Sequence, residues 1–292
     1  MAQHRFDETV RVLIAMLAVT FGLAASVFVG ADLTASAQPD AATQAAPTQP
    51  EVDAEAWLIA NLDTGEILAA RNASERRAPA STIKTLLALV ALDQLPLNST
   101  IVANKASVDV ECSCAGVKPG RPYTALQLLA GALLVSGNDA ANTLADMLGG
   151  PQAAVAKMNL KAKQVGALNT YAATPSGLDG PGITGLTTPH DLAVIFRAAL
   201  AKPMFVRIMQ APSAMFPDDN GFRTLTNQDK LLGSYPGILG GKTGYTDIAG
   251  KTFVGAAQRD GRRLVVVFMG GGPEDYWDQA ANMLNWGFSQ PH

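Results

Sequence analysis

The chain of 292 residues has few of the side chains that build metal centres and disulfide frameworks, with 2 cysteines and 3 histidines. His4 and His292 lie near the chain ends, so only His190 could serve an interior site. Two cysteines cannot form a four-thiolate zinc site or a set of several disulfides. We therefore expect no zinc or three-histidine metal site, and a Ser-His-Asp triad could use His190 alone.

Charge is also scarce, since Asp, Glu, Lys and Arg make up 16% of the residues and the net charge is −3. An average soluble domain is about 25% charged. Nucleic-acid-binding proteins concentrate positive charge, so we expect no nucleic-acid partner. Together with a hydrophobic content of 48%, the low charge predicts a large core rather than disorder.

The N-terminus has the pattern of an export signal. Arg5 and Arg11 precede an uncharged apolar run, Val12–Ala31, and Ala35-Ser36-Ala37 forms a small-x-small cleavage site before Gln38. Residues 1–37 are therefore predicted to be a signal peptide. The apolar run is also long enough to span a bilayer, so an uncleaved N-terminal anchor is the alternative. Both place the rest of the chain outside the cytoplasm, as a secreted protein in the periplasmic or cell-wall space.

Residues 38–50 are rich in Ala, Pro, Gln and Thr and have no apolar period, which predicts a flexible linker. Residues 51–292 then form one folded domain. Within it the apolar period predicts strands near both ends and helices between them. The expected strands are Ala56–Ala60, Glu66–Ala70, Gly240–Tyr245, Thr252–Ala257 and Leu264–Met269, and the expected helices are Ser81–Leu95, Thr124–Met147 with a break at Ser136–Asn138, Gln152–Val165, Pro189–Ala201 and Tyr276–Phe288. This order predicts an α+β domain whose N- and C-terminal strands share one antiparallel sheet packed against the helices.

Ser81 and Lys84 are the first pair of candidate catalytic residues. They are three positions apart and lie on one side of the predicted helix. Burial among Leu86 and Leu87 would lower the pKa of the lysine, which could then take the proton of the serine. Because Ser-x-x-Lys is short and common, a helix-terminal serine beside a surface lysine is the alternative.

Two further polar motifs interrupt apolar surroundings. Ser136-Gly137-Asn138 breaks a helical hairpin, where the alternative is a loop with Asn138 or Asp139 as a helix cap. Lys242-Thr243-Gly244 lies on a glycine-flanked strand that a ligand can approach closely. A lysine beside a threonine suits a carboxylate, and a glycine-rich turn with a surface lysine is the alternative.

The ordered set Ser-x-x-Lys, Ser-x-Asn and Lys-Thr-Gly resembles the signature of penicillin-binding proteins and serine β-lactamases. The surrounding residues most resemble the D-alanyl-D-alanine carboxypeptidases, which are low-molecular-mass penicillin-binding proteins, and among them the compact secreted actinobacterial type. The likeness covers roughly Ala54–Phe288, through Ala80–Lys84, Leu134–Ala141, Thr174–Asp179, Tyr235–Gly237 and Lys242–Thr246.

This resemblance implies a role for each motif residue. Ser81 would be the acylated nucleophile, Lys84 its general base, Ser136 a proton relay, and Asn138 a group that holds the substrate amide and orients Lys84. Substrate binding would fall to Lys242 and Thr243, which take the terminal carboxylate, and to Gly244 and Tyr245, with the N–H groups of Ser81 and Tyr245 forming the oxyanion hole. The implied partners are peptidoglycan stem peptides ending in D-Ala-D-Ala and the β-lactams that mimic them, bound by a monomer. The resemblance also implies that neither a metal nor a cofactor is needed.

The sequence departs from this pattern in three places. Only 48 residues follow Gly244, so we expect no additional C-terminal domain. Some relatives bind the substrate carboxylate with an arginine late in the sheet, but the last arginine here is Arg263, so recognition would rest on Lys242 and Thr243. Cys112 and Cys114 could form a local disulfide outside the cell or remain two thiols.

Other activities of the same superfamily remain open. A class A β-lactamase is disfavoured because no glutamate lies between Glu111 and Glu274 to activate the deacylating water, and Asp179 reads as a structural loop residue. A glutaminase of related fold fits the motif contexts poorly. A D,D-endopeptidase would use the same residues. A catalytically silent wall-binding protein would have no reason to keep a buried lysine beside a serine.

Overall fold

The computed structural model describes residues 48–272 and 276–291 of the chain. The predicted signal peptide or anchor, residues 1–37, and most of the predicted linker lie outside the described residues. Among the residues that are described, no helix is both long enough and apolar enough to cross a membrane.

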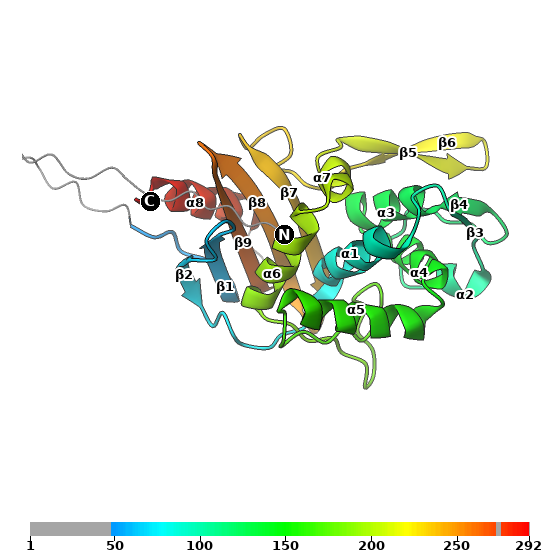
Figure 1. The fold of residues 1–292 in the computed structure, drawn as a ribbon, viewed down its shortest axis with the longest axis horizontal. Coiled ribbons are helices and arrows are strands. Elements are labelled where there is room, and N and C mark those ends of the chain that lie inside the picture. The colour runs from blue at the N-terminus through cyan, green and yellow to red at the C-terminus, as the bar shows by residue number, and fades with distance from the viewer. Residues whose placement is uncertain (1–47, 273–275, 292) are drawn as a thin grey trace, which may run out of the picture. The chain divides into compact units, whose positions relative to one another are not determined.

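A five-stranded antiparallel sheet joins the two ends of the domain, as predicted (Figure 1). Its order is β2-β1-β9-β8-β7. Val267 at its centre pairs with Leu58 on one side and with Val254 on the other. The strands are β1 (Ala54–Asn61), β2 (Ile67–Arg71), β7 (Ile238–Thr246), β8 (Gly250–Arg259) and β9 (Arg262–Gly271). Each of the five lies within about two residues of its predicted range or extends it.

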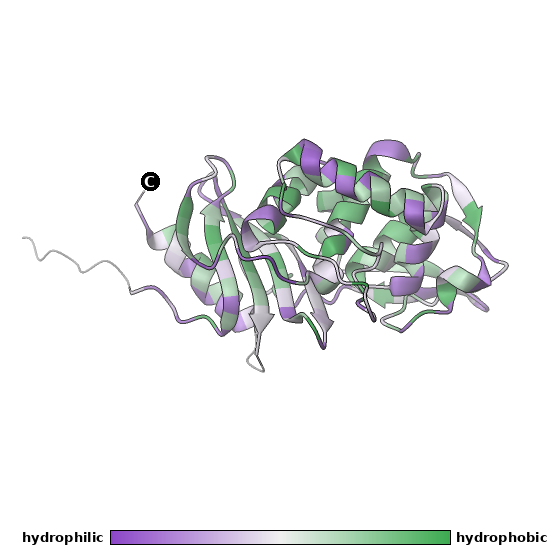
Figure 2. Ribbon diagram, turned by 90° about the horizontal axis from the view of Figure 1, so that it is seen from below, coloured by the Kyte–Doolittle hydropathy of each residue, from purple (hydrophilic) through white to green (hydrophobic). Residues whose placement is uncertain are grey.

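Both faces of the sheet are buried, which explains the continuous apolar run of β9. Val265 and Val267 belong to the core on the side of the helical region, whereas Leu264 and Val266 belong to the core under α8 (Tyr276–Ser289). Figure 2 shows the hydrophobic residues following the strands and the inner sides of the helices. A strand buried on both faces cannot alternate with polar residues, so its sequence reads as a solid hydrophobic segment.

The helical region surrounds α1 (Lys84–Gln94), which packs against each of the helices α3 to α7 (Figure 1). Every residue from Lys84 to Ala91 is buried, so α1 has no polar face. The helices of this region are α2 (Lys105–Val108), α3 (Ala125–Leu134), α4 (Asn138–Met147), α5 (Pro151–Val165), α6 (Pro189–Leu200) and α7 (Pro203–Met209). A buried helix without solvent contact holds its side chains in fixed positions, and the first of these side chains is Lys84.

The start of α1 differs from the prediction of a regular helix from Ser81. Residues Ala80–Ile83 form a 3-10 turn, η1, and the α-helix begins at Lys84. The chain enters through Ala80 in a left-handed conformation, with φ +47°. A 3-10 turn is tighter than an α-helical turn and suits this abrupt entry.

The sequence analysis did not identify two small sheets. One pairs β3 (Thr100–Val102) with β4 (Pro122–Thr124), and the other pairs β5 (Ser213–Asp218) with β6 (Gly221–Thr226). In the second hairpin Phe216 and Leu225 are buried, so the period-2 pattern is weak. The hairpin signal that could have revealed it is Asn220-Gly221 at its turn.

Gly177 provides a test of how tightly a loop packs on the 3-10 turn η1. Its φ is +84°, and a Cβ atom there would lie 2.0 Å from the carbonyl oxygen of Ala80. Gly177→Ala should lower the free energy of unfolding by at least about 2 kcal/mol more than Gly182→Ala, measured by urea denaturation. Gly182 is the matched control because its φ is +72° and nothing lies within 4 Å. Equal losses in the two variants would contradict the close packing.

Candidate active site

The three motifs meet at one place between the sheet and the helical region. Lys84 Nζ lies 2.6 Å from Ser81 Oγ and donates to Asn138 Oδ1 at 2.7 Å. It also donates to the carbonyl oxygen of Ser176 at 2.8 Å. Lys242 Nζ donates to Ser136 Oγ at 2.9 Å. Residues from four distant parts of the chain thus form two sets of polar contacts, and Ser81, Ser136 and Asn138 from these sets line one cavity.

Ser81 is held by close contact between η1 and β7. A Cβ atom on Gly244 would lie 2.7 Å from Ser81 N and 3.0 Å from Ala80 Cβ, so only glycine fits at that position. Thr252 Oγ1, on the neighbouring strand, donates to the carbonyl oxygen of Pro79 at 2.9 Å. The turn η1, which carries Ser81, is therefore packed directly against the strand that carries Lys242 and Thr243.

The two motif lysines lie in an environment that disfavours their charged forms. Lys84 is fully buried, and this burial, together with the charge of Lys242, holds its pKa well below the ordinary range, with Asp139 acting in the opposite direction. Burial alone lowers the pKa of Lys242 to about 7. A lysine with a lowered pKa carries a lone pair at neutral pH, so Lys84 can accept the proton of Ser81.

The polar break between α3 and α4 occurs where it was predicted. Ser136 is buried with φ +59°, a left-handed conformation that is costly for a residue with a side chain. Gly137 occupies the N-cap position of α4 and makes no side-chain cap, so neither Asn138 nor Asp139 is the cap residue. The strained conformation of Ser136 accompanies the contact of its hydroxyl with Lys242.

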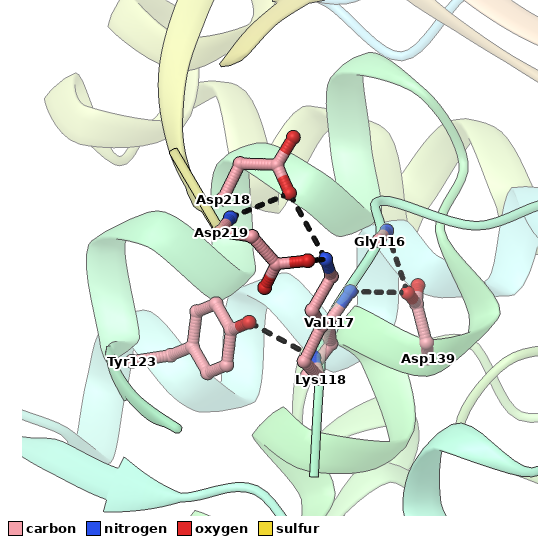
Figure 3. A network of polar contacts seen from close by, with 7 residues as sticks. All are labelled: Gly116, Val117, Lys118, Tyr123, Asp139, Asp218 and Asp219. Atoms are coloured by element: carbon pink, nitrogen blue, oxygen red, sulfur yellow. Dashed lines mark hydrogen bonds and ion pairs between the residues drawn. The ribbon is translucent and has the colours of Figure 1, made fainter. Parts of the chain in front are cut away.

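Asp139 was not predicted as a site residue, although its hydrogen bonds hold in place a segment that forms one wall of the site. Its carboxylate accepts 2.8 Å hydrogen bonds from the backbone N–H groups of Ala115, Gly116 and Val117. Figure 3 shows two of these bonds, and beside them Lys118 paired with Asp218 and Asp219 at the β5–β6 turn. The segment before Ala115 is thereby fixed over the site, and Asn138 Nδ2 donates to the Glu111 carbonyl oxygen at 2.7 Å.

A cavity of about 370 Å3 opens over Ser81. Cys112 lies on its rim and is joined to Cys114 by a disulfide, with the two Cα atoms 4.9 Å apart. The lining residues are Ser81, Glu111, Cys112, Ser113, Ser136, Asn138, Leu178, Gln228, Thr243, Gly244, Tyr245, Lys251 and Tyr276. Gln228, Lys251 and Tyr276 come from segments to which the sequence analysis assigned no function.

No metal-binding cluster occurs in the described part of the chain, where no three His, Cys, Asp or Glu residues lie close enough to hold an ion. His190 is on α6, with Nδ1 3.4 Å from Asp191 Oδ1, and does not line the cavity. The site therefore offers a serine and two lysines rather than a histidine-based triad.

Comparison with known proteins identifies the family of the chain. A family model described as D-alanyl-D-alanine carboxypeptidase matches residues 43–272. The D-alanyl-D-alanine carboxypeptidase DacB2 of Mycobacterium tuberculosis is 62% identical over 244 residues, which cover 82% of this chain and 84% of that protein.

The chain belongs to the D-alanyl-D-alanine carboxypeptidase family.

It is a serine-type D-Ala-D-Ala carboxypeptidase with an α+β transpeptidase fold. A crystal structure of a D-alanyl-D-alanine carboxypeptidase from M. tuberculosis superimposes with a TM-score of 0.82 at 59% identity, covering 85% of this chain and 96% of that one. A Streptomyces DD-transpeptidase structure superimposes with a TM-score of 0.77 at 30% identity, covering 83% of this chain and 100% of that one.

One buried carboxyl group of the carboxypeptidase lies behind the Lys242 strand and was not predicted. Asp229 is buried; its Oδ1 accepts from Leu231 N at 2.9 Å, whereas its Oδ2 has no hydrogen-bond partner. Oδ2 would lie 3.4 Å from a Cβ atom placed on Gly241, the residue before Lys242. Burial raises the pKa of Asp229 from 3.8 to about 6.

Asp229 predicts a dependence of stability on pH. Because its pKa is higher in the folded than in the unfolded protein, the folded state binds the proton more tightly, and stability falls as pH rises from about 4 through about 6. Asp229→Asn should remove this loss. The free energy of unfolding of the variant relative to wild type should increase by about 2 kcal/mol between pH 4 and pH 7.5, measured by urea denaturation. A difference that does not change with pH would show that Asp229 does not titrate in this range.

Proposed function

We propose that this carboxypeptidase removes the terminal D-alanine of peptidoglycan stem peptides through an acyl-enzyme on Ser81. The observation that carries the proposal is the fully buried Lys84 amine, 2.6 Å from Ser81 Oγ and held by Asn138 and the Ser176 carbonyl. A neutral amine at hydrogen-bond distance from a hydroxyl is a general base in place.

Acylation then takes the following course. Lys84 accepts the Ser81 proton as Oγ attacks the carbonyl carbon of the penultimate D-alanine. The negative charge that develops on the carbonyl oxygen is stabilised by the N–H groups of Ser81 and Tyr245, each worth roughly 3–4 kcal/mol in comparable sites. The close contact of Gly244 with Ser81 N supports this placement of the two donors.

The leaving group needs a proton as its C–N bond breaks. Ser136, whose hydroxyl accepts from Lys242 Nζ and which lines the same cavity as Ser81, donates this proton to the amine of the departing D-alanine and regains one from the Lys84 ammonium group formed during acylation. Asn138 binds the substrate amide, and Lys242 and Thr243 bind the terminal carboxylate. Water then attacks the ester, with Lys84 as base, and releases the shortened peptide and free Ser81.

The same geometry accounts for acylation by β-lactams. Their ring amide takes the position of the scissile peptide bond, and their carboxylate takes the position of the D-alanine carboxylate. The leaving nitrogen stays attached to the acyl group through the rest of the opened ring. Water then reaches the ester slowly, and we expect a persistent adduct on Ser81.

We also assign residues 51–292 to a single catalytic domain that works as a monomer outside the cytoplasm. The Cys112–Cys114 disulfide supports this location, because disulfides persist in oxidising compartments. The apolar segment Val12–Ala31 supports export through a signal peptide or an N-terminal anchor.

Mixing the protein with benzylpenicillin and following the intact mass tests the nucleophile. Wild type should gain one penicillin mass within minutes and keep it for hours. Ser81→Ala should gain none, because no hydroxyl remains, and should keep its thermal midpoint. An adduct in Ser81→Ala would place the nucleophile elsewhere, and the absence of an adduct in wild type would contradict the proposed site.

A second variant tests the base. Lys84→Met removes the amine while keeping the length of the side chain, so acylation by benzylpenicillin should slow by about 10²- to 10⁴-fold. The thermal midpoint is measured alongside and should fall modestly, since the substitution leaves Asn138 Oδ1 and the Ser176 carbonyl oxygen without this donor. An unchanged acylation rate would exclude Lys84 as the base.

A further inference from the structure

The cavity over Ser81 contains a cation that the three motifs do not include. Lys251, near the start of β8, lines this cavity together with Thr243 and Tyr245. It is half-buried, and its Nζ lies 5.7 Å from the centroid of the Tyr276 ring, which lines the same cavity. The sequence analysis left carboxylate binding to Lys242 and Thr243, because no arginine occurs late in the sheet.

The strand register places Lys251 beside the carboxylate-binding threonine. Tyr245 is directly opposite Lys251, and Thr243 is opposite Phe253. Opposite residues of an antiparallel pair share a face of the sheet, so Thr243 and Lys251 are diagonal neighbours on one face, about 7–8 Å apart and within reach of a long side chain. Lys242 extends to the other face, where its Nζ contacts Ser136.

The charge balance of the site leaves room for another cation. Lys84 and Lys242 are both buried, and burial lowers the pKa of each, that of Lys242 to about 7. Lys242 Nζ also donates to Ser136 Oγ and to the Thr243 carbonyl oxygen. A substrate carboxylate placed at Thr243 would therefore meet one lysine whose charge is weakened and whose donors are already in use.

We propose that Lys251 is a further substrate-binding residue of this enzyme, whose ammonium group pairs with the terminal carboxylate of the substrate while the Thr243 hydroxyl donates to the same group. The Tyr276 ring, which attracts the ammonium through its face, orients the lysine toward the cavity. Lys251 thus selects peptides with a free C-terminus over blocked ones. This inference rests on the acyl-enzyme function proposed above for Ser81.

The test compares two substrates that acylate the same serine. One is an N-acylated peptide ending in D-Ala-D-Ala, and the other is an N-acyl-D-alanine methyl ester, which has no terminal carboxylate. Lys251→Met should lower kcat/KM for the peptide by about 10- to 100-fold, mainly through KM, and leave kcat/KM for the ester within about twofold of wild type. Lys251→Arg should restore most of the activity on the peptide.

Two controls separate charge at the cavity from charge in general. Lys163→Met removes an exposed lysine of α5 that does not line the cavity. It should leave kcat/KM unchanged for both the peptide and the ester. Added salt should reduce kcat/KM for the peptide in wild type and much less in Lys251→Met, because the salt-sensitive ion pair is already absent.

The outcomes distinguish this inference from the function on which it rests. Equal losses on both substrates would show that Lys251 is structural, and no loss on either would show that the carboxylate is bound without it. If wild type itself turns over neither substrate, the acyl-enzyme function fails first, and the assignment of Lys251 fails with it.

Discussion

The buried amine of Lys84 is the constraint on which the rest of this enzyme depends. An ammonium group in a fully buried position is costly, so the protein stabilises the neutral form, which can accept a proton. The amine contacts Ser81, Asn138 and the Ser176 carbonyl. It is thus the point at which the helical region, the α3–α4 break and the loop at Gly177 meet, and this position underlies the proposed role of Lys84 as base.

The core supports this arrangement. Helix α1 is buried on all sides, and its first residue is Lys84, so the position of the amine is set by apolar packing rather than by polar contacts alone. On the other side, β7 approaches η1 so closely that Gly244 admits no side chain. The cavity over Ser81 thus lies beside two closely packed elements, η1 and β7, an arrangement that suits acyl transfer because it would keep a nucleophile and oxyanion donors aligned.

The lysines of the cleft differ in how deeply they are buried. The two motif lysines are buried and have lowered pKa values, which suits the proton transfer and binding proposed for them. Lys251 lines the wall of the cavity, is less buried than they are, and lies near the ring of Tyr276. Buried lysines with lowered pKa values can exchange protons in the interior of the site, whereas a less buried lysine on the cavity wall can attract a carboxylate.

Features that lie within a single stretch of sequence could be predicted, because the pattern that reveals each of them is local. The solid apolar run of β9, the all-apolar helix after Lys84 and the break at Ser136–Asn138 identified the sheet, the buried helix and the hairpin, and the order of the motifs indicated the family. Asp139, Asp229 and Lys251 could not be found in this way. Asp139 acts through backbone groups more than 20 residues earlier in the chain, Asp229 is buried by a strand that follows it, and Lys251 reaches the site only because β8 pairs with β7. Local pattern therefore determined the elements and the residues proposed as nucleophile and base. The environment of those residues was decided by burial, register and loop contacts, which depend on segments far apart in the chain.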